Sequence, residues 1–206
     1  LGQQIRDDGP KRHLAKSGTP TMGGILIIFA VVLSTLLWAD MTNRYVWLVV
    51  VATVGFGAVG FADDYLKFIK RQSKGLSAAQ KFSGQILVAL AIGVFLYTLP
   101  SYTTKLSVPF FKFFTPDLGW FYIVFVILVI VGSSNAVNLT DGLDGLAIGP
   151  VMLASLAYTI VAYVTGNRVM AEYLLIPYIE GAGEIAIFTG AILGSSLGFL
   201  WFNTYP

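Results

Sequence analysis

Long apolar runs, separated by short polar segments, recur along the whole chain. A helix that crosses the hydrocarbon core of a bilayer needs roughly 20 mainly apolar residues, and about 17–25 are tolerated. Six runs meet this requirement, over residues 22–39, 45–62, 82–99, 118–137, 146–165 and 185–202. The pattern therefore predicts an all-α fold, a polytopic transmembrane helical bundle in which residues 1–206 form a single integral membrane domain.

Glycine is frequent inside these runs, as at Gly57, Gly60, Gly190, Gly194 and Gly198. Small residues let transmembrane helices approach closely, so these positions are candidates for packing seams between helices. Glycine is also common in membrane helices in general, and the sequence leaves both interpretations open.

The positions of lysine and arginine predict how the chain is oriented. With six spans, the connecting segments alternate between the two sides of the membrane, and basic loops stay in the cytoplasm. The side with more basic residues holds nine, namely Arg6, Lys11, Arg12, Lys16, Lys67, Lys70, Arg71, Lys74 and Lys81. The other side holds four, namely Arg44, Lys105, Lys112 and Arg168. On that outer side, residues 105–114 form an amphipathic segment at the interface, and residues 166–184 form a loop.

The acidic residues divide in the same way. The cytoplasmic side holds Asp7, Asp8, Asp63, Asp64, Asp141 and Asp144. The outer side holds Asp40, Asp117, Glu172, Glu180 and Glu184.

Composition agrees with the membrane class and excludes several others. The chain is 56% hydrophobic and 12% charged, whereas soluble domains have about 25% charged residues. The absence of cysteine excludes a disulfide scaffold and cysteine-based metal sites. The formal net charge of +2 does not indicate a nucleic-acid partner. Residues 1–20 lack the apolar stretch of a signal peptide, and both chain ends are typical of an excerpt of a longer protein.

A pair of adjacent aspartates, Asp63 and Asp64, stands where the second run meets the cytoplasm. Charged groups near the bilayer are costly and are therefore functional candidates. Neighbouring carboxylates repel unless a cation lies between them, and Mg²⁺ suits oxygen ligands that bridge to phosphates. If the helix continues, Lys67 lies one turn further on and offers a positive charge to a phosphate. The alternative is a helix end with solvated charges that pair at this spacing.

A second polar segment, NAVNLTDGLDG, begins at Asn135 near the end of the fourth run. Asn138, Asp141 and Asp144 are spaced by three and share one face if the segment is helical. Its glycines favour a broken helix instead. Either arrangement supplies carboxylates, amides and backbone donors, and irregular backbone at membrane depth is tolerated where it lines a cavity. The alternative is an Asp-Gly turn, which needs one such dipeptide and not two.

Weaker candidates lie near the two ends of the chain. Lys16 and Thr21, in KSGTPTMGG, would contact phosphates at a helix start, or the threonine would only cap that helix. Asn203, after the sixth run, would bond a ligand or end a helix. His13 is the only histidine and is expected to be solvated. All these motifs fall on the cytoplasmic side, which favours a Mg²⁺ and phosphate site there.

Four strings occur in an order that resembles one enzyme superfamily: LAKSGTPTMGG, GFADDYLK, NAVNLTDGLDGLA and FLWFNTYP. They resemble the polyprenyl-phosphate N-acetylhexosamine-1-phosphate transferases and, among these, most closely the phospho-N-acetylmuramoyl-pentapeptide transferases. The resemblance extends over essentially all 206 residues. It implies that undecaprenyl phosphate attacks UDP-N-acetylmuramoyl-pentapeptide at the inner face of the bacterial cytoplasmic membrane. UMP leaves, and lipid I of peptidoglycan synthesis forms.

The resemblance also implies roles for individual residues. Asp63 and Asp64 match an aspartate pair that positions or deprotonates the lipid phosphate and binds Mg²⁺, and Asp141 matches a further catalytic aspartate. Other matched positions are expected near the substrates: Lys16, Thr21, Lys67, Lys81, Asn138, Gly142, Leu143, Asp144 and Asn203.

The sequence departs from the superfamily's pattern at its end. The superfamily carries its main Mg²⁺-linked aspartate and a histidine-rich loop after the NTYP string, and its full fold has about ten spans. This sequence ends at Pro206, the last residue of that string. The resemblance therefore places the main Mg²⁺ ligand beyond Pro206, and we expect residues 1–206 to be inactive on their own.

Three other functions compete with this interpretation. A related transferase would use UDP-N-acetylglucosamine with the same lipid. A transporter would place carboxylates in mid-span, whereas here they stand at span ends. A scaffolding protein would not need paired aspartates. The sequence fits a monomer and a homodimer equally well.

Overall fold

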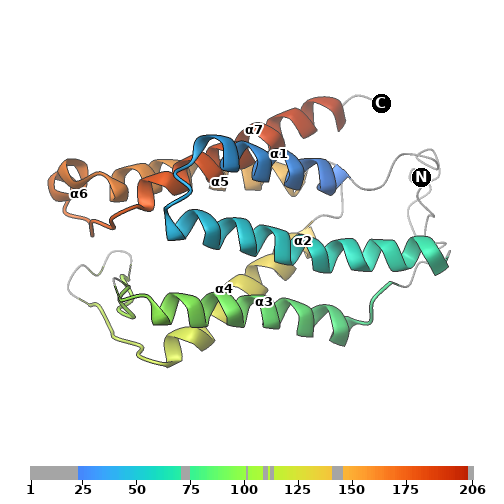
Figure 1. The fold of residues 1–206 in the computed structure, drawn as a ribbon, viewed down its shortest axis with the longest axis horizontal. Helices are drawn as coiled ribbons and strands as arrows, with labels where there is room; N and C mark the ends of the chain where they lie inside the picture. Colours follow the sequence, from blue (N-terminus) through green and yellow to red (C-terminus); the bar gives the residue numbers. More distant parts are fainter. Residues whose placement is uncertain are drawn as a thin grey trace. The chain divides into compact units, whose positions relative to one another are not determined.

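The computed structural model describes residues 23–70, 75–100, 102–108, 111, 114–140 and 146–203. Within these described ranges, five helices are long and apolar enough to cross a membrane. They are α2 (Arg44–Lys70), α3 (Ala78–Thr98), α4 (Phe121–Thr140), α5 (Ile148–Gly166) and α7 (Ile185–Asn203). A sixth apolar helix, α1 (Gly23–Trp38), has 16 residues. The predicted class is confirmed: the chain is a multi-pass helical membrane protein (Figure 1).

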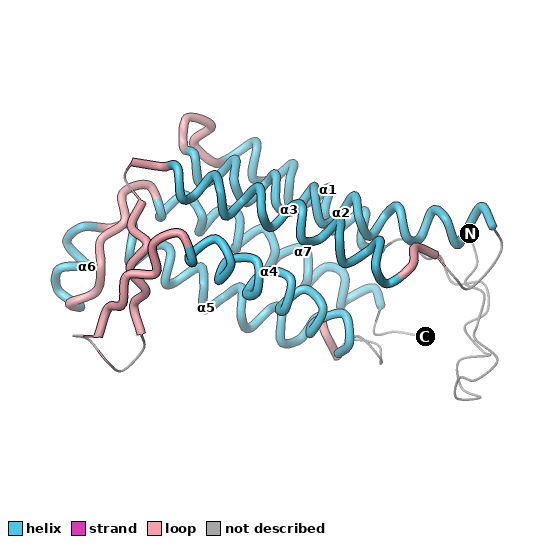
Figure 2. Tube along the Cα trace, turned by 90° about the horizontal axis from the view of Figure 1, so that it is seen from below, coloured by secondary structure: helices cyan, strands magenta, loops and turns pink. Residues whose placement is uncertain are grey.

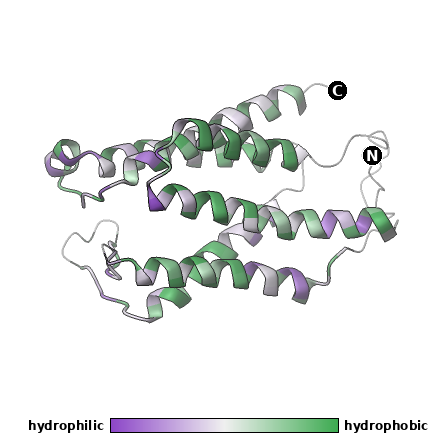
Figure 3. Ribbon diagram, in the orientation of Figure 1, coloured by the Kyte–Doolittle hydropathy of each residue, from purple (hydrophilic) through white to green (hydrophobic). Residues whose placement is uncertain are grey.

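The helices satisfy many of their own polar groups, as lipid favours, although the buried Ser196 hydroxyl of α7 has no hydrogen-bond partner among the described residues. Backbone groups bond within each helix, and several threonine hydroxyls donate to a carbonyl oxygen one turn earlier. Thr35 is fully buried, and its hydroxyl lies 2.7 Å from the Val31 oxygen. Figure 3 shows the helices as largely hydrophobic, with hydrophilic residues gathered near helix ends and in loops. Figure 2 shows that the loops join the helices at their ends.

Helix α2 continues beyond the predicted span of residues 45–62, to Lys70. Hydropathy falls after Ala62, but the last two turns are still helical because a lysine there pairs with carboxylates one turn earlier. A helix rises about 1.5 Å per residue, so Arg44 and Asp63 are about 28 Å apart along the axis. That is close to the hydrocarbon thickness of about 30 Å. The charged turns of α2 therefore begin about one hydrocarbon thickness from the start of the helix.

The region expected to be a simple outer loop, residues 166–184, contains structure that the hydropathy pattern missed. It holds the short helix α6 (Arg168–Leu174) and a 3₁₀ turn, η2 (Ala182–Glu184). The Asn167 side chain caps α6 by accepting a hydrogen bond from the Met170 N–H at 3.1 Å. Leu175, in the left-handed region with φ 55°, ends it. Local capping and not apolar periodicity defines this helix.

The described chain divides into two compact units. Unit 1 comprises residues 1–77 and 140–206 and contains α1, α2, α5, α6, η2 and α7. Unit 2 comprises residues 78–139 and contains α3 and α4. That both belong to one integral membrane domain stays a prediction.

At one end of unit 1, the loop between α1 and α2 is bonded to the segment that starts α7. The Asp40 N–H donates to Glu184 Oε2 at 2.8 Å, and Asn43 Nδ2 donates to the Gly181 carbonyl at 2.8 Å. Gly181 has a φ of 83°, which favours glycine. Hydrogen bonds from Thr42 lower the pKa of the Asp40 carboxyl. These bonds join two distant parts of the sequence at this end of the unit.

The opposite end of unit 1 gathers four helix termini. Because the helices alternate in direction, the start of α1, the end of α2, the start of α5 and the end of α7 all lie there (Figure 1). Gly23 at the start of α1 lies against the Phe199 ring near the end of α7, where an added Cβ would be 2.8 Å from the ring. This is the arrangement that the alternation of predicted spans requires.

Unit 2 is built on the pair α3 and α4. Gly93 of α3 packs against Ile123 of α4, where an added Cβ would lie 3.2 Å from the isoleucine side chain. Between the helices, Lys105 forms an isolated antiparallel bridge with Asp117. The Thr104 hydroxyl and the Gly119 N–H donate to Asp117 and lower the pKa of its carboxyl. That residues 105–114 lie at the outer interface stays a prediction.

The helix glycines differ in whether they lie at a close contact between two helices. Gly57 lies against Ile28 of α1, and an added Cβ would be 2.7 Å from that side chain. Gly60 and the α7 glycines Gly190, Gly194 and Gly198 have no such neighbour within 4 Å among the described residues. Close approach therefore explains Gly57, and general membrane-helix composition suffices for the others.

The tightest glycine contact generates a stability prediction. A Cβ on Gly166, at the end of α5, would lie 2.2 Å from the backbone nitrogen of Gly183, which cannot move aside as a side chain can. We expect Gly166→Ala to lower the free energy of unfolding by about 1–3 kcal/mol, as overpacking does. Gly149→Ala is the matched control, because that position in α5 has no atom within 4 Å among the described residues. Thermal unfolding in detergent measures both variants, and equal melting temperatures would contradict the expected contact.

Candidate functional site

The aspartate pair and Lys67 form one cluster in the last turns of α2. Lys67 Nζ lies 2.7 Å from Asp63 Oδ2 and 3.1 Å from Asp64 Oδ1. Helix α2 continues past the aspartate pair to Lys70. Lys67 therefore lies one helical turn beyond Asp63, as the sequence analysis predicted for a continuous helix. The Asp63 side chain is 13% exposed and that of Asp64 is 56% exposed. The two carboxylates are therefore unequal, and the alternative of a fully solvated helix end does not describe Asp63.

Asp63 is held by a second contact that the sequence did not reveal. The N–H of Leu76, in the segment after α2, donates to Asp63 Oδ1 at 2.8 Å. An added Cβ on Gly75 would lie 2.2 Å from Asp63 Oδ1 and 2.6 Å from the Asp63 backbone oxygen. Only glycine fits so close to Asp63. Gly75 and Leu76 therefore hold the Asp63 carboxylate in a fixed position. A glycine in the polar loop after the second apolar run is the one signal of this contact in the sequence. The sequence does not show that Gly75 lies against Asp63.

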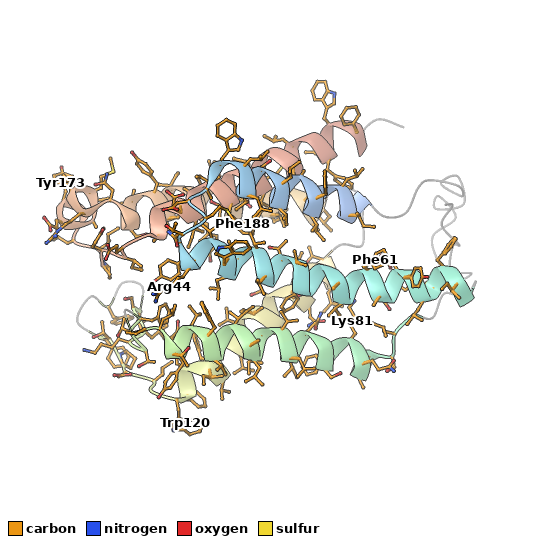
Figure 4. The ribbon with its side chains drawn as sticks, in the orientation of Figure 1. Arg44, Phe61, Lys81, Trp120, Tyr173 and Phe188 are labelled. Atoms are coloured by element: carbon orange, nitrogen blue, oxygen red, sulfur yellow. The ribbon has the colours of Figure 1, made fainter. Side chains whose placement is uncertain are left out.

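Asp63 and Asp64 share the one ammonium group of Lys67. Lys67 already lies where a shared cation is expected between close carboxylates. On α2, Phe61 stacks on Tyr65, with ring centroids 5.7 Å apart. Figure 4 labels Phe61 and Arg44 toward opposite ends of this helix. An apolar, aromatic helix thus carries the acidic cluster at one end.

The donor set of the cluster fits Mg²⁺. This ion is usually bound by one or two carboxylates together with substrate phosphates and water. No group of three or more Asp, Glu, His or Cys side chains that could hold a metal occurs among the described residues. Two carboxylates completed by phosphate oxygens are therefore the arrangement that Asp63 and Asp64 can offer.

The other described candidates are placed as follows. Asn203 is the last residue of α7 and thus lies at the same end of unit 1 as the α2 cluster. Lys81 is in the first turns of α3, and Figure 4 labels its side chain there. Asn138 is exposed near the end of α4. Lys81 and Asn138 belong to unit 2, so their approach to Asp63 stays a prediction.

Six predicted site residues lie outside the described residues: Lys16, Thr21, Asp141, Gly142, Leu143 and Asp144. Helix α4 reaches Thr140, three residues past its predicted end, so Asn135 and Asn138 are helical. The choice between a helical and a broken arrangement of residues 141–145 stays open.

The expectation about the main Mg²⁺ ligand concerns the other end of the chain. Pro206, beyond which the resemblance places that aspartate, also lies outside the described residues, which end at Asn203. That a further carboxylate joins Asp63 and Asp64 at the metal therefore stays a prediction.

Comparison with known proteins agrees with the resemblance of the motifs. Residues 46–206 match the model of the family described as glycosyl transferase family 4. Residues 16–28 match the phospho-N-acetylmuramoyl-pentapeptide-transferase signature 1. The second match includes Lys16 and Thr21.

Several curated relatives carry the name phospho-N-acetylmuramoyl-pentapeptide-transferase. The protein of Syntrophus aciditrophicus is 55% identical over 206 residues, which is 100% of this chain and 57% of the relative. That of Desulfotalea psychrophila is 56% identical with the same coverage. That of Nitratidesulfovibrio vulgaris is 57% identical over 194 residues, 94% of this chain and 54% of the relative. The chain thus spans a little over half the length of these relatives. It is a member of glycosyl transferase family 4.

Proposed function

We propose that the protein is a phosphoglycosyl transferase that moves phospho-N-acetylmuramoyl-pentapeptide from its UDP carrier to undecaprenyl phosphate. The observation that carries the proposal is the cluster of Asp63, Asp64 and Lys67 at the end of an apolar helix. The names of relatives 55–57% identical to this chain supply the substrate. The whole cluster lies within the segment that matches the family model.

The reaction is a displacement at phosphorus. A phosphate oxygen of the lipid bonds to the β-phosphorus of the donor, the bond from that phosphorus to the bridging oxygen breaks, and UMP leaves with the electron pair. The product is lipid I. Such transfers depend on positioning and on neutralising charge, and they need little covalent chemistry from the protein. A lipid phosphate is already anionic near neutral pH, so no strong base is required.

The unequal environments of the two aspartates suggest different tasks. Asp63 has one oxygen bonded to Leu76 and the other paired with Lys67, so its carboxylate fixes the geometry of the cluster. Asp64 is the more exposed carboxylate and is the better placed to meet an incoming group. Lys67 is 39% exposed, and its three N–H donors can turn from the carboxylates to a substrate phosphate.

Asp64 and Asp63 would hold Mg²⁺ together with the donor pyrophosphate. When bound, the ion neutralises negative charge on the phosphate oxygens. The remaining predicted residues, on the segment from Asn138 to Asp144 and at Lys16 and Thr21, would bind the nucleotide and sugar.

We place this site at the cytoplasmic face of the bacterial inner membrane. Support comes from the division of basic residues, nine against four. The geometry of unit 1 agrees, because the ends of α2 and α7 lie opposite the end bonded through Asn43 and Gly181. Lys67 and Lys70 are on the α2 end, whereas Arg44 starts the helix at the other.

The proposed activity is tested with the chain in its full-length form in detergent. With radiolabelled UDP-N-acetylmuramoyl-pentapeptide and undecaprenyl phosphate, we expect lipid I and UMP in the presence of Mg²⁺ and neither product after chelation. UDP-N-acetylglucosamine is the competing donor. Transfer from that donor alone would overturn the proposed substrate.

Substitutions at the aspartates are part of the same assay. Asp63→Asn, Asp64→Asn and Asp141→Asn should each lower turnover about 100-fold or more, since each removes charge that stabilises the reacting groups. Asparagine at position 63 retains an oxygen for the Leu76 N–H, so the fold is kept. Normal rates in all three variants would reject the site.

The contact between Gly75 and the Asp63 carboxylate generates a separate prediction. Gly75→Ala should lower turnover about tenfold or more, because the added Cβ would displace the Asp63 carboxylate from its position. Gly60→Ala is the matched control, because Gly60 lies in α2, the helix that carries Asp63, and has no atom within 4 Å among the described residues. Initial rates of UMP release are compared with melting temperatures. Equal rates in both variants would show that Asp63 does not need this contact.

Residues 1–206 on their own should not catalyse the transfer. The superfamily's main Mg²⁺-linked aspartate and histidine-rich loop are expected after Pro206, and this chain covers 57% of a relative's length. Expression of residues 1–206 alone, followed by measurement of UMP release, checks this. A rate comparable to that of a full-length relative would make those further motifs dispensable.

A further inference from the structure

A part-buried amide pair joins the two helices of unit 2. Gln85 of α3 is 4% exposed. Asn135 of α4 donates through Nδ2 to Gln85 Oε1 at 2.7 Å and to the Val131 carbonyl of its own helix at 2.8 Å. Further along α3 the buried residues are apolar or glycine, at Ala89, Ile92, Gly93 and Leu96. The amide pair is thus a polar contact in an otherwise apolar interface.

The chemistry of the pair fixes which way the Asn135 amide points. The Val131 carbonyl can only accept a hydrogen bond, so the atom beside it must be the Asn135 nitrogen. Its two hydrogens are then used by Val131 and Gln85, and Gln85 must present its oxygen. The Asn135 oxygen is left as the acceptor, and Val131 and Gln85 together hold its direction.

The pair lies just before the part of α4 that carries predicted site residues. Asn138 follows Asn135 by three residues and therefore lies on the same face of the helix. The rotation of α4 about its axis at Asn135 therefore sets the direction in which Asn138 points.

We propose that Gln85 is a positioning residue for the transfer reaction. Its buried oxygen holds the Asn135 amide together with the Val131 carbonyl and fixes the rotation of the last turns of α4, from which Asn138 is presented to the nucleotide donor. Polar groups inside a membrane protein are costly and usually serve function. A leucine would fill the same space without that cost. The inference rests on the proposed function, because it concerns the binding of the same donor.

The experiment measures kcat and the KM of each substrate for Gln85 variants of the full-length enzyme. Gln85→Leu should raise the KM for UDP-N-acetylmuramoyl-pentapeptide about tenfold and leave the KM for undecaprenyl phosphate unchanged. Gln85→Glu should restore the donor KM, because a carboxyl group keeps an oxygen acceptor in either protonation state. Gln85→Met, flexible and apolar, is measured as well, so that misfolding of the leucine variant does not decide the result.

Two matched controls separate positioning from stability. Thr159→Val removes another interhelical bond, the 2.8 Å contact between Thr159 and Thr189 hydroxyls of α5 and α7. Ser83→Ala changes an exposed α3 residue whose hydroxyl bonds within its own helix. Both should leave both KM values unchanged, even where Thr159→Val lowers the melting temperature.

The outcomes are distinct. An unchanged donor KM in Gln85→Leu and Gln85→Met, with kcat reduced only in proportion to the folded fraction, would assign Gln85 a packing role and overturn the inference. Failure of Gln85→Glu to restore the donor KM would overturn it too. Absence of transfer by the wild-type enzyme would overturn the proposed function, and this inference with it.

Discussion

An unpartnered polar group costs several kcal/mol in the hydrocarbon core of a bilayer, and this cost arranges the whole chain. The backbone meets it by forming helices, and buried hydroxyls such as that of Thr35 meet it by bonding to their own helix. Charged groups avoid this desolvation cost by lying at helix ends. The α2 cluster is the clearest case, since its carboxylates begin about one membrane thickness from the start of the helix. The place of this charged cluster is therefore set by the length of α2.

The apolar pattern was sufficient to predict where most helices lie, because run length alone decides whether a segment spans. It was less able to predict where they end. The second predicted span stopped at Ala62, where hydropathy falls, yet α2 goes on to Lys70. Ion pairs one turn apart support helix in water as well as in lipid, and hydropathy does not register them. Helix α6 was missed for a similar reason, since it depends on its Asn167 cap.

The candidate site could be predicted by residue type but not by contact. Adjacent aspartates and a lysine four positions on have a local relation that the helix period reveals. The contacts of Asp63 with Gly75 and Leu76 and of Asn135 with Gln85 join residues 12 or more positions apart. Such contacts arise from tertiary packing, and the helix period of a single sequence does not predict them. The same holds for the glycines: Gly57 lies against Ile28, whereas Gly60 has no neighbour within 4 Å in the described part of the chain, although both occur in one apolar run.

The bonds at the far end of unit 1 have a mechanical consequence. There the loop between α1 and α2 is joined to the start of α7 through Asn43 and Gly181 and through Asp40 and Glu184. Backbones of α5 and η2 also meet there, at Gly166 and Gly183. A change at Asp40 or Asn43 therefore reaches the start of α7 directly, although a long stretch of chain separates them in the sequence.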